Sequence, residues 1–203
     1  MGFYAQVITP RVMNFFMSAK EFPAYRAELL KHAQGKVLEI GFGSGLNLPF
    51  YPEHIKQIDT VDSNAGMQPL AQKNIAQSAI QVKQHTLSAE QLPFADNTFD
   101  TVVSTWTLCS IPDVAQALSE IKRILKPEGR FLFVEHGLSP EVKVQKWQHR
   151  LNPVQKTLFD GCHLDRNIEK IVAGAGFKFE KLRKEYAGSP KLFSYFYFGI
   201  AHK

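Results

Sequence analysis

The run Val37-Leu38-Glu39-Ile40-Gly41-Phe42-Gly43-Ser44-Gly45-Leu46-Asn47 carries the strongest structural signal in the chain. A short apolar strand with one acid leads directly into three glycines. Glycine has no Cβ, so the backbone can turn tightly here and approach a ligand closely. A helix that follows would point its free N–H groups at that ligand. The pattern predicts a ligand-binding bend after a strand, and an ordinary strand–helix turn is the alternative.

The spacing of these glycines separates two classes of cofactor. Dinucleotide-binding motifs read G-x-G-x-x-G and would require a glycine at position 46, where this chain has Leu46. The pattern here is G-x-G-x-G, with Glu39 two residues before its first glycine. A pyrophosphate needs the positive end of a helix, whereas a carboxylate at the tip of a strand suits a ligand with a cationic amino acid end.

Strands and helices alternate along the rest of the chain. Further strands are expected at 55–61, 80–85, 99–104, 130–135, 177–186 and 193–202, and helices at 66–78, 115–125, 141–159 and 167–175. We expect the helix over 141–159 to break near Pro153. The alternation predicts an α/β fold with a Rossmann-like, doubly wound, seven-stranded and mostly parallel sheet. The last two strands have no helix between them and are expected to form a hairpin, which gives the sheet an antiparallel edge and an antiparallel C-terminal strand. Such sheets bind ligands at the carboxyl ends of their strands.

The length of 203 residues suits one domain with a sizeable core and is short for two. We expect a helical cap at 1–34, a cofactor-binding core at 36–136, and substrate-side helices with the terminal hairpin at 137–203. A hydrophobic content of 44% with 21% charged residues excludes long disorder, collagen and coiled coil.

The cellular location is predicted from three features that the sequence lacks. No apolar run reaches the ~18–20 residues that cross a bilayer. The first residues have no signal-peptide pattern, and two cysteines cannot build a disulfide-rich secreted scaffold. A reduced, cytoplasmic protein is therefore expected.

Asp62 ends the second expected strand, 21 residues after Gly41 (62 − 41). An acid at this position can accept hydrogen bonds from both hydroxyls of a ribose. The alternative is a helix N-cap, which Ser63 or Asn64 could form equally well. Farther along, the loop at 88–100 could cover an adenine, with backbone groups near Ala89 reading its edge.

Together these segments resemble the class I S-adenosylmethionine-dependent methyltransferases, in the branch that includes the quinone-biosynthesis enzymes. The matching segments lie in the family's order and spacing: 37–45, 61–62, 89–94, 99–100 and 121–129. A closer likeness, to the small microsomal thiol methyltransferase-like proteins, extends over nearly the whole chain. It rests on Asn47, Tyr51-Pro52, Leu108-Cys109-Ser110, Glu135-His136 and Phe159-Asp160-Gly161-Cys162 with Leu164 and Arg166.

The resemblance implies S-adenosyl-L-methionine as the cofactor and assigns residues to each of its parts. The methionine end would be held by Glu39, Gly41, Gly43 and Gly45. Asp62 would hold the ribose, and Ser63 or Asn64 would flank it. Ala89 and Glu90 would lie at the adenine, and Thr105 beside the sulfonium. Many relatives carry an acid where this chain has Ser88, so the backbone or Glu90 must serve the adenine amine here.

Methyl transfer is an in-line displacement, so the protein must mainly align the nucleophile with the methyl group. A base is needed only when the nucleophile arrives protonated. His136 follows the fifth strand and is a candidate base or substrate orienter. Asp160, in an Asp-Gly turn, is a second candidate catalytic residue. The alternatives are a hydrogen-bonded strand-end histidine and a plain turn.

Cys109 and Cys162 are expected to be small buried hydrophobes. The spacing of cysteines and histidines matches no zinc-binding motif, so no metal is expected.

The expected partner is a small-molecule substrate, namely a thiol, a quinone-like phenol or a lipid head group. One alternative is a nucleic-acid methyltransferase. Its Asn/Asp-Pro-Pro-Tyr loop is absent, because Ser104-Thr105-Trp106-Thr107-Leu108 stands after the fourth strand, and a net charge of +5 is modest. A second alternative is a non-catalytic protein that binds S-adenosylmethionine, because a fold does not fix a function. The sequence indicates no oligomeric state.

The N-terminal stretch is rich in aromatic residues and has three interpretations. It could be a lid over an apolar substrate, plain packing on the sheet, or a helix in peripheral contact with a membrane. The aromatic residues are Phe3, Tyr4, Phe15, Phe16, Phe22 and Tyr25. The first 20 residues are shorter and more polar than the anchor helix of the microsomal proteins, which argues against membrane attachment.

Overall fold

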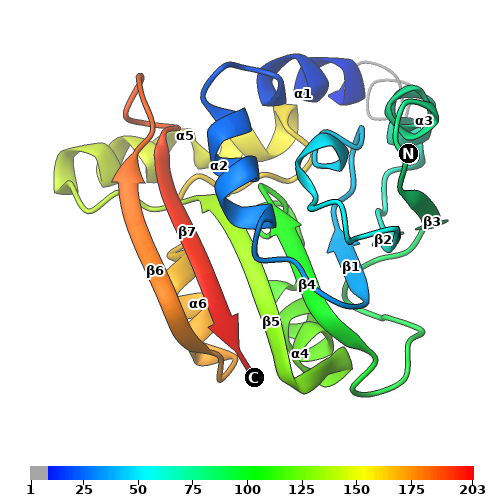
Figure 1. Ribbon diagram of the computed structural model, residues 1–203. Coiled ribbons are helices and arrows are strands. Elements are labelled where there is room, and N and C mark those ends of the chain that lie inside the picture. The colour runs from blue at the N-terminus through cyan, green and yellow to red at the C-terminus, as the bar shows by residue number, and fades with distance from the viewer. Residues whose placement is uncertain (1–8) are drawn as a thin grey trace.

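The computed structural model describes residues 9–203 and contains one sheet of seven strands in the order β3-β2-β1-β4-β5-β7-β6 (Figure 1). The strands are β1 (Val37–Ile40), β2 (Gln57–Val61), β3 (Gln81–His85), β4 (Phe99–Thr105), β5 (Leu125–His136), β6 (Lys178–Tyr186) and β7 (Tyr195–His202). This is the Rossmann-like α/β architecture that the alternation of strands and helices predicted.

Strands β1 to β5 pair in parallel, and β7 is antiparallel to both of its neighbours, β5 and β6. The predicted hairpin, which gives the sheet an antiparallel edge, is therefore confirmed. The antiparallel strand β7 is buried along its length, and β6 forms the edge of the sheet. Tyr195 to Ala201 are apolar on both faces, which is typical of an inner strand rather than of an edge.

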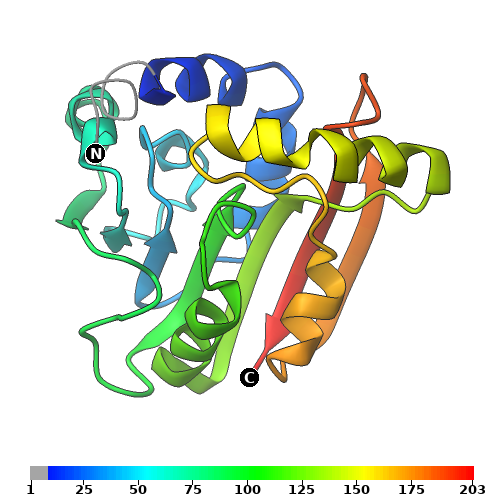
Figure 2. The same cartoon turned by 180° about the vertical axis from the view of Figure 1, so that it is seen from behind.

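The helices are α1 (Thr9–Met17), α2 (Phe22–Leu30), α3 (Gln68–Ala76), α4 (Val114–Ile124), α5 (Val142–Leu158) and α6 (Ile168–Gly174), and short 3₁₀ turns cover Leu48–Phe50 and Ala65–Met67. Helices α4 and α6 pack on one face of the sheet, and α2 and α3 pack on the other. Helices α1 and α5 lie across the end of the sheet where β1, β4 and β5 finish (Figures 1 and 2).

Helix α4 shows why the sequence gives these layers. Its apolar side chains recur at helical spacing, and Leu118, Ile121 and Ile124 are fully buried against the sheet. The helix begins where the Asp113 carboxylate accepts a hydrogen bond from the Gln116 N–H at 3.0 Å. This cap fixes the loop between β4 and α4, which leads away from the carboxyl edge of the sheet.

Two expectations about element boundaries are wrong. Helix α5 continues through Pro153 without a break. A proline removes one backbone hydrogen bond, and this part of the helix is exposed, so water can replace that bond. Strand β5 begins at Leu125 rather than at residue 130, because a register shift in its pairing with β4 accommodates the Pro127-Glu128-Gly129 segment.

Within residues 9–203, none of the helices is both long enough and apolar enough to cross a bilayer.

Candidate cofactor site at the carboxyl ends of the strands

A cavity of about 350 Å³ lies at the carboxyl ends of β1, β2 and β4. Its wall includes the glycine bend after β1, the residues after β2, the loop at 87–89 and the residues after β4. Helix α1 closes it from above with Met13, Asn14 and Met17. The cavity therefore lies where parallel sheets of this kind bind ligands.

Gly41 makes the bend after β1 possible. Its φ is +72°, and a Cβ there would lie 1.9 Å from the Thr107 hydroxyl oxygen. Gly43 has a φ of +57° and lines the cavity. The nearest atom to the position that a Cβ would take there is the Gly41 carbonyl oxygen, at 4.0 Å. Gly45 was predicted to bind the ligand, but it lies behind the wall, where a Cβ would meet Phe42 and Leu48. Gly41 and Gly43 thus border the ligand space, and Gly45 supports them.

Glu39 is almost completely buried at the tip of β1. Its carboxylate accepts hydrogen bonds from the Tyr51 hydroxyl at 2.7 Å and from the Asn47 amide at 2.9 Å. Burial raises the pKa of Glu39 to about 7, although both hydrogen bonds and the Arg26 charge oppose the shift. This acid is therefore poised to ionise fully when a cation enters the cavity.

Asp62 connects the glycine bend with the turn after β2. One carboxylate oxygen accepts from the Gly43 N–H at 2.7 Å, and the other accepts from the Asn64 N–H at 2.8 Å. Burial raises its pKa. The alternative N-cap role belongs to Asn64, whose side chain accepts from the Gly66 N–H. Asp62 and Ser63, which were predicted to lie at the ribose, both line the cavity.

Asp160 also lines the cavity, next to these residues. Its carboxylate accepts a hydrogen bond from the Asn64 amide at 2.9 Å. Its φ is +49° and that of Gly161 is +80°, which confirms the predicted Asp-Gly turn. The turn brings the α5–α6 loop to the side of the cavity that holds Asp62.

The loop after β3 contributes Ser88 and Ala89 to the wall. Glu90, which was predicted to meet the adenine, does not line the cavity. Its carboxylate accepts from the Ser88 hydroxyl at 2.7 Å and from the Asp113 N–H at 2.6 Å. Glu90 therefore fixes the loop against the start of α4 and leaves the backbone near Ala89 facing the ligand space.

Thr105 and Trp106 form the wall at the end of β4. The Thr105 hydroxyl accepts from the Asn47 amide at 3.0 Å. Trp106 has φ +51°, and it is one of three non-glycine residues with positive φ in the described chain, of which Trp106 and Asp160 border the cavity. Backbone strain of this kind gathers at functional sites.

Arg26, on α2, was not predicted to belong to the site. It is 4% exposed and lines the cavity, with its guanidinium over the Trp106 ring at 5.1 Å. Burial lowers the pKa of Arg26 to about 10, which leaves it charged at neutral pH. Its helix shows only packing periodicity, so no sequence signal marked this arginine as a ligand-binding residue.

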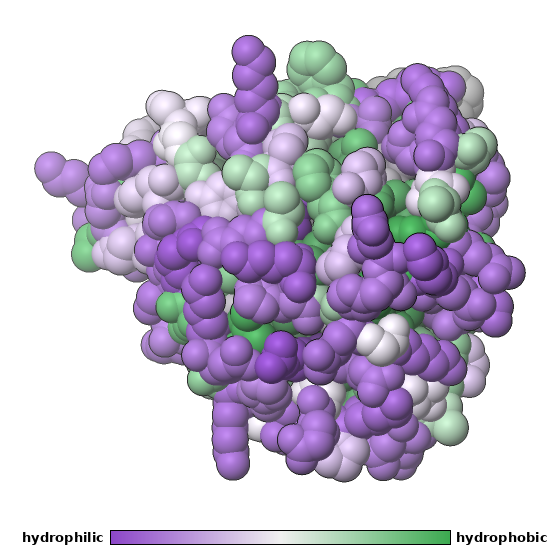
Figure 3. Space-filling view, viewed as in Figure 1, coloured by the Kyte–Doolittle hydropathy of each residue, from purple (hydrophilic) through white to green (hydrophobic). Residues whose placement is uncertain are grey.

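Helix α1 lies over the cavity, and its role as a lid stays a prediction. The Asn14 side chain accepts a hydrogen bond from the Ser44 hydroxyl at 2.6 Å, which ties the helix to the glycine bend. Phe15 and Phe16 point outward and are 75% and 54% exposed. Figure 3 shows apolar surface where α1 covers the top of a largely hydrophilic face.

Phe22 and Tyr25 fit the packing interpretation instead. The Phe22 ring lies 4.6 Å from the Trp106 ring, and the Tyr25 hydroxyl donates to Glu185 at 2.9 Å. Phe3 and Tyr4 lie outside the described residues.

His136 stands at the end of β5, as predicted, but it does not line the cavity. Its Nε2 atom lies 3.0 Å from Cys162 Sγ, which lies 3.7 Å from Cys109 Sγ. Both cysteines are buried, in agreement with the prediction. Hydrogen bonding with Cys109 and the charge of His136 lower the pKa of Cys162, whereas hydrogen bonding with Cys162 and burial raise the pKa of Cys109. Cys162 raises the pKa of His136 against the opposing effect of burial.

Comparison with known proteins identifies the family. The family described as "Methyltransferase domain" matches residues 38–133. Thiol S-methyltransferase TMT1A of Homo sapiens is 30% identical over 192 residues, which cover 92% of this chain and 75% of the relative. The chain belongs to this methyltransferase family. A phosphatidylethanolamine N-methyltransferase of Cereibacter sphaeroides is 30% identical over 161 residues, which cover 78% of each chain.

The fold of this methyltransferase agrees with solved structures. A SAM-dependent methyltransferase of Thermotoga maritima matches with a TM-score of 0.66 at 21% identity, over 98% of this chain and 99% of that one. The family and the fold imply S-adenosyl-L-methionine as the cofactor, as predicted.

The cavity of the methyltransferase fits this cofactor. Three buried polar atoms on its wall have no hydrogen-bond partner: Arg26 Nε, Asn47 Oδ1 and Trp106 Nε1. An unpaired buried polar atom is costly, so a polar ligand is expected to satisfy these atoms. Glu39, which ionises beside a cation, and positive Arg26 interact on the same wall, which suits the ammonium and carboxylate groups of a methionine moiety.

Proposed function

We propose that this methyltransferase transfers the methyl group of S-adenosylmethionine to the sulfur of a small-molecule thiol. The observation that carries the proposal is the lack of histidine, lysine and tyrosine among the described residues that line the cavity. Among the described residues that line it, the ionisable side chains are Arg26, Glu39, Asp62 and Asp160. A thiol has a pKa near about 8.5 and ionises without a strong base, whereas an amine or a phenol must lose a more tightly held proton.

The similarity to thiol S-methyltransferase TMT1A over 92% of the chain supports the same substrate class. The phosphatidylethanolamine N-methyltransferase of Cereibacter sphaeroides points to an amine instead. The cavity favours the thiol, because it offers no histidine, lysine or tyrosine from the described residues to deprotonate an ammonium group.

In the proposed reaction, S-adenosylmethionine supplies an electrophilic methyl group. Glu39 binds the ammonium group of the cofactor, and Arg26 binds its carboxylate. Asp62, already oriented by the Gly43 and Asn64 N–H groups, accepts from the ribose hydroxyls. Ser63 flanks the ribose, and the backbone near Ala89 binds the adenine edge.

The remaining residues of the site hold the reacting groups and exclude water. Thr105 and Trp106 lie at the strand tip that would face the sulfonium, and α1 covers the cavity. Alignment of a bound nucleophile with a bound methyl group can be worth ~7–11 kcal/mol of the barrier. The catalytic roles predicted for His136 and Asp160 stay predictions, and of the two only Asp160 borders the cavity.

An acceptor panel tests the proposed function. The purified full chain is incubated with S-adenosylmethionine and, in separate reactions, 2-mercaptoethanol, a hydroxylated quinone, phosphatidylethanolamine vesicles and a DNA duplex. Formation of S-adenosylhomocysteine and of the methylated acceptor is followed by mass spectrometry. We expect turnover with the thiol at least ~10-fold above the other acceptors, since only the thiol reaches its reactive anion without a base.

Two outcomes contradict the proposal. Faster turnover of the amine, the phenol or the nucleic acid would assign a different acceptor. Tight binding of S-adenosylmethionine without turnover of any acceptor would favour a non-catalytic binding protein.

A further inference from the structure

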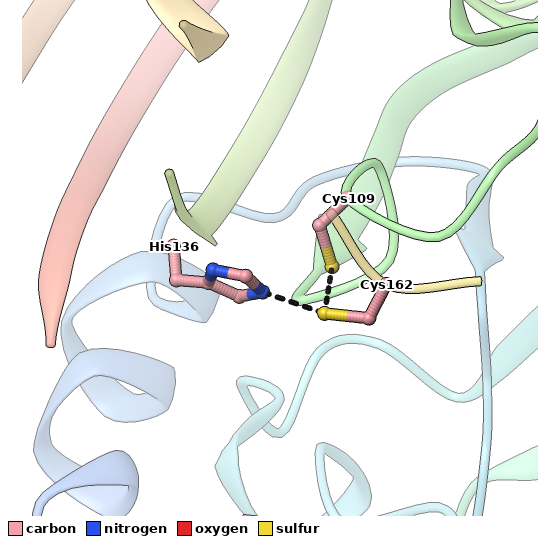
Figure 4. A group of neighbouring side chains, drawn as sticks. All are labelled: Cys109, His136 and Cys162. Carbon is pink, nitrogen blue, oxygen red and sulfur yellow. Dashed lines mark hydrogen bonds between the residues drawn. The ribbon is translucent and has the colours of Figure 1, made fainter. Parts of the chain in front are cut away.

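Cys109, His136 and Cys162 form a compact group in which each residue offers one metal-binding atom (Figure 4). The three atoms all lie within 4.8 Å of one another. Cys109 lies in the β4–α4 loop, His136 at the end of β5 and Cys162 in the α5–α6 loop. Along the chain, Cys162 is 26 residues from His136 and 53 residues from Cys109. Spacing along the chain could not predict this group, because only the fold gathers it.

The distance between the two sulfurs matches a tetrahedral metal ion. Zn²⁺ binds thiolate sulfur at 2.3 Å and imidazole nitrogen at 2.0–2.1 Å, which places two sulfurs about 3.8 Å apart and a sulfur and a nitrogen about 3.5 Å apart. The sulfurs of Cys109 and Cys162 are 3.7 Å apart, and His136 Nε2 is 3.0 Å from Cys162 Sγ. His136 would have to shift to lengthen its 3.0 Å contact with Cys162, and all three ligand atoms already lie within 4.8 Å of one another.

We propose that Cys109, His136 and Cys162 bind one Zn²⁺ ion, whose fourth position takes the sulfur of the acceptor thiol. Two thiolates and a neutral imidazole balance the charge of the divalent ion. Thiolate and imidazole ligands select zinc over the hard cations magnesium and calcium, which prefer oxygen. Three protein ligands leave one coordination position for an external ligand, as in catalytic zinc sites.

The surroundings of the cysteines are already organised. The Glu135 carboxylate, completely buried, accepts hydrogen bonds from the N–H groups of Thr107 and Leu108, which fixes the loop that carries Cys109. The Gln155 side chain donates to Cys162 Sγ at 3.6 Å. Such outer partners orient the ligands of a metal site and tune the ion.

The charges around the group also favour a cation. Glu135 lies close enough to act on Cys109, and the half-buried guanidinium of Arg166 lies on the same side and donates to the Leu108 carbonyl. Arg166 can balance Glu135. The two thiolates that form when the ion binds would take their counter-charge from the divalent ion itself.

Residues beside the metal group line the cofactor cavity. Ser110, next to Cys109, and Asp160, two residues before Cys162, both line the cavity, and Ser110 Oγ lies 3.7 Å from Cys109 Sγ. This part of the inference rests on the proposed thiol substrate. The acceptor would enter from the cavity and lose its proton to water as its sulfur binds the ion.

The reaction then balances without another reagent. The acceptor sulfur forms the new S–CH₃ bond, the bond between the methyl carbon and the sulfonium breaks, and its electron pair stays on the sulfur of S-adenosylhomocysteine. In this arrangement His136 is a metal ligand and is not available as a base.

Zinc content of the full chain tests the site. Protein loaded with zinc sulfate, desalted and analysed by mass spectrometry should hold about one Zn²⁺ per chain. Cys162→Ser and His136→Gln should each lose most of it, and His149→Gln should retain it, because this exposed histidine lies outside the group. Loading with Co²⁺ should give thiolate-to-cobalt charge-transfer absorption in the wild type and in His149→Gln only.

Thermal unfolding and binding of S-adenosylhomocysteine show which variants fold. If the cysteine variant does not fold, His136→Gln still tests the site, because it removes one metal ligand and retains both thiols. Wild-type protein that binds no zinc, or whose Cys109 and Cys162 are joined as a disulfide in the zinc-loaded sample, would overturn the metal site.

Activity separates this inference from the proposed function. Removal of zinc by a chelator should lower thiol methylation at pH 7 by ~10-fold or more, because an unbound thiol is mostly protonated there. An unchanged rate would overturn the role of the ion at the acceptor. Bound zinc without any thiol methylation would refute the thiol acceptor but leave the metal site intact.

Discussion

Glu39 and Arg26 are two buried ionisable residues on the wall of one cavity. The sequence predicted the role of Glu39 in the site but not that of Arg26. Glu39 belongs to the strand–glycine motif, so its position follows from local sequence. Arg26 reaches the site only because α2 packs on the sheet beside Trp106. Tertiary packing decides which face of a helix meets a cavity, and the sequence of α2 does not show which face that is.

The raised pKa of Glu39 predicts that cofactor binding depends on pH. Burial raises this pKa from 4.5 to about 7, and the ammonium group of the cofactor favours the ionised form. We expect the dissociation constant of S-adenosylhomocysteine to fall as pH rises from about 6 to about 8. Calorimetry across this range measures it, and Glu39→Gln should remove most of the dependence.

The same group affects the stability of the cofactor-free protein. Because the folded-state pKa is raised, the stabilising contribution of neutral Glu39 is fully present below 4.5 and is lost as pH rises through about 7. Glu39→Gln should therefore raise the melting temperature relative to wild type at pH 8 but not at pH 4. A difference of equal size at both values would contradict the shift.

Arg26 is predicted to bind the cofactor carboxylate. Arg26→Met keeps apolar bulk beside Phe22 and Trp106 but removes the charge, and hydrogen bonds to charged groups are worth about 1.5–3 kcal/mol. We expect binding of S-adenosylhomocysteine to weaken by ~10–100-fold in calorimetry. Arg150→Met, on the exposed face of α5, is the matched control. Equal affinities in both variants would remove Arg26 from the site.

At the scale of elements, β1 and its glycine bend were predictable because strand, turn and ligand contact lie within a few residues. The length of β5 and the unbroken course of α5 were not predictable from the sequence. Pro127 and Pro153 both read as breaks, but one lies beside a register shift in the sheet and the other lies in a solvated helix. The surroundings of a proline decide its effect, and the sequence does not show them.

The bend after β1 gives a prediction at the same scale. Gly41→Ala would place a Cβ 1.9 Å from the Thr107 hydroxyl oxygen at a φ of +72°. We expect a lower melting temperature and loss of detectable cofactor binding, since the left-handed backbone alone costs about 1–2 kcal/mol. Gly174→Ala is the control, because nothing lies within 4 Å of its Cβ position in α6. If the two variants melt and bind alike, the bend tolerates a side chain.

At the scale of the whole molecule, Glu28 links the N-terminal helices to the far edge of the sheet. Its carboxylate accepts two hydrogen bonds from Arg183 at 2.8 Å and one from Lys181 at 2.9 Å, both on β6. The Arg183 hydrogen bonds lower the pKa of Glu28 to about 2. This contact joins α2, which carries Arg26, to the last part of the chain.

Glu28→Gln should therefore lower the melting temperature at pH 7. Because the folded-state pKa is depressed, the contribution is present above 4.5 and is lost as pH falls through about 2. The difference from wild type should shrink over that acid range. Glu141→Gln, which removes an exposed ion pair with Lys191, should have a smaller effect at every pH.

The overall topology was predictable because strands and helices alternate regularly from residue 37 onward. The gathering of Cys109, His136 and Cys162 was not, because it depends on how three loops meet above the sheet. The division at residues 34 and 136, the cytoplasmic location and the peripheral membrane contact stay predictions.

The two tryptophans of the chain occupy opposite environments, and this gives the protein two built-in fluorescent reporters. Trp106 is 7% exposed and lines the cavity, whereas Trp147 on α5 is 56% exposed. Iodide in solution should quench mainly the emission of Trp147. What remains would come from Trp106, so occupancy of the cavity could be read optically without any attached label.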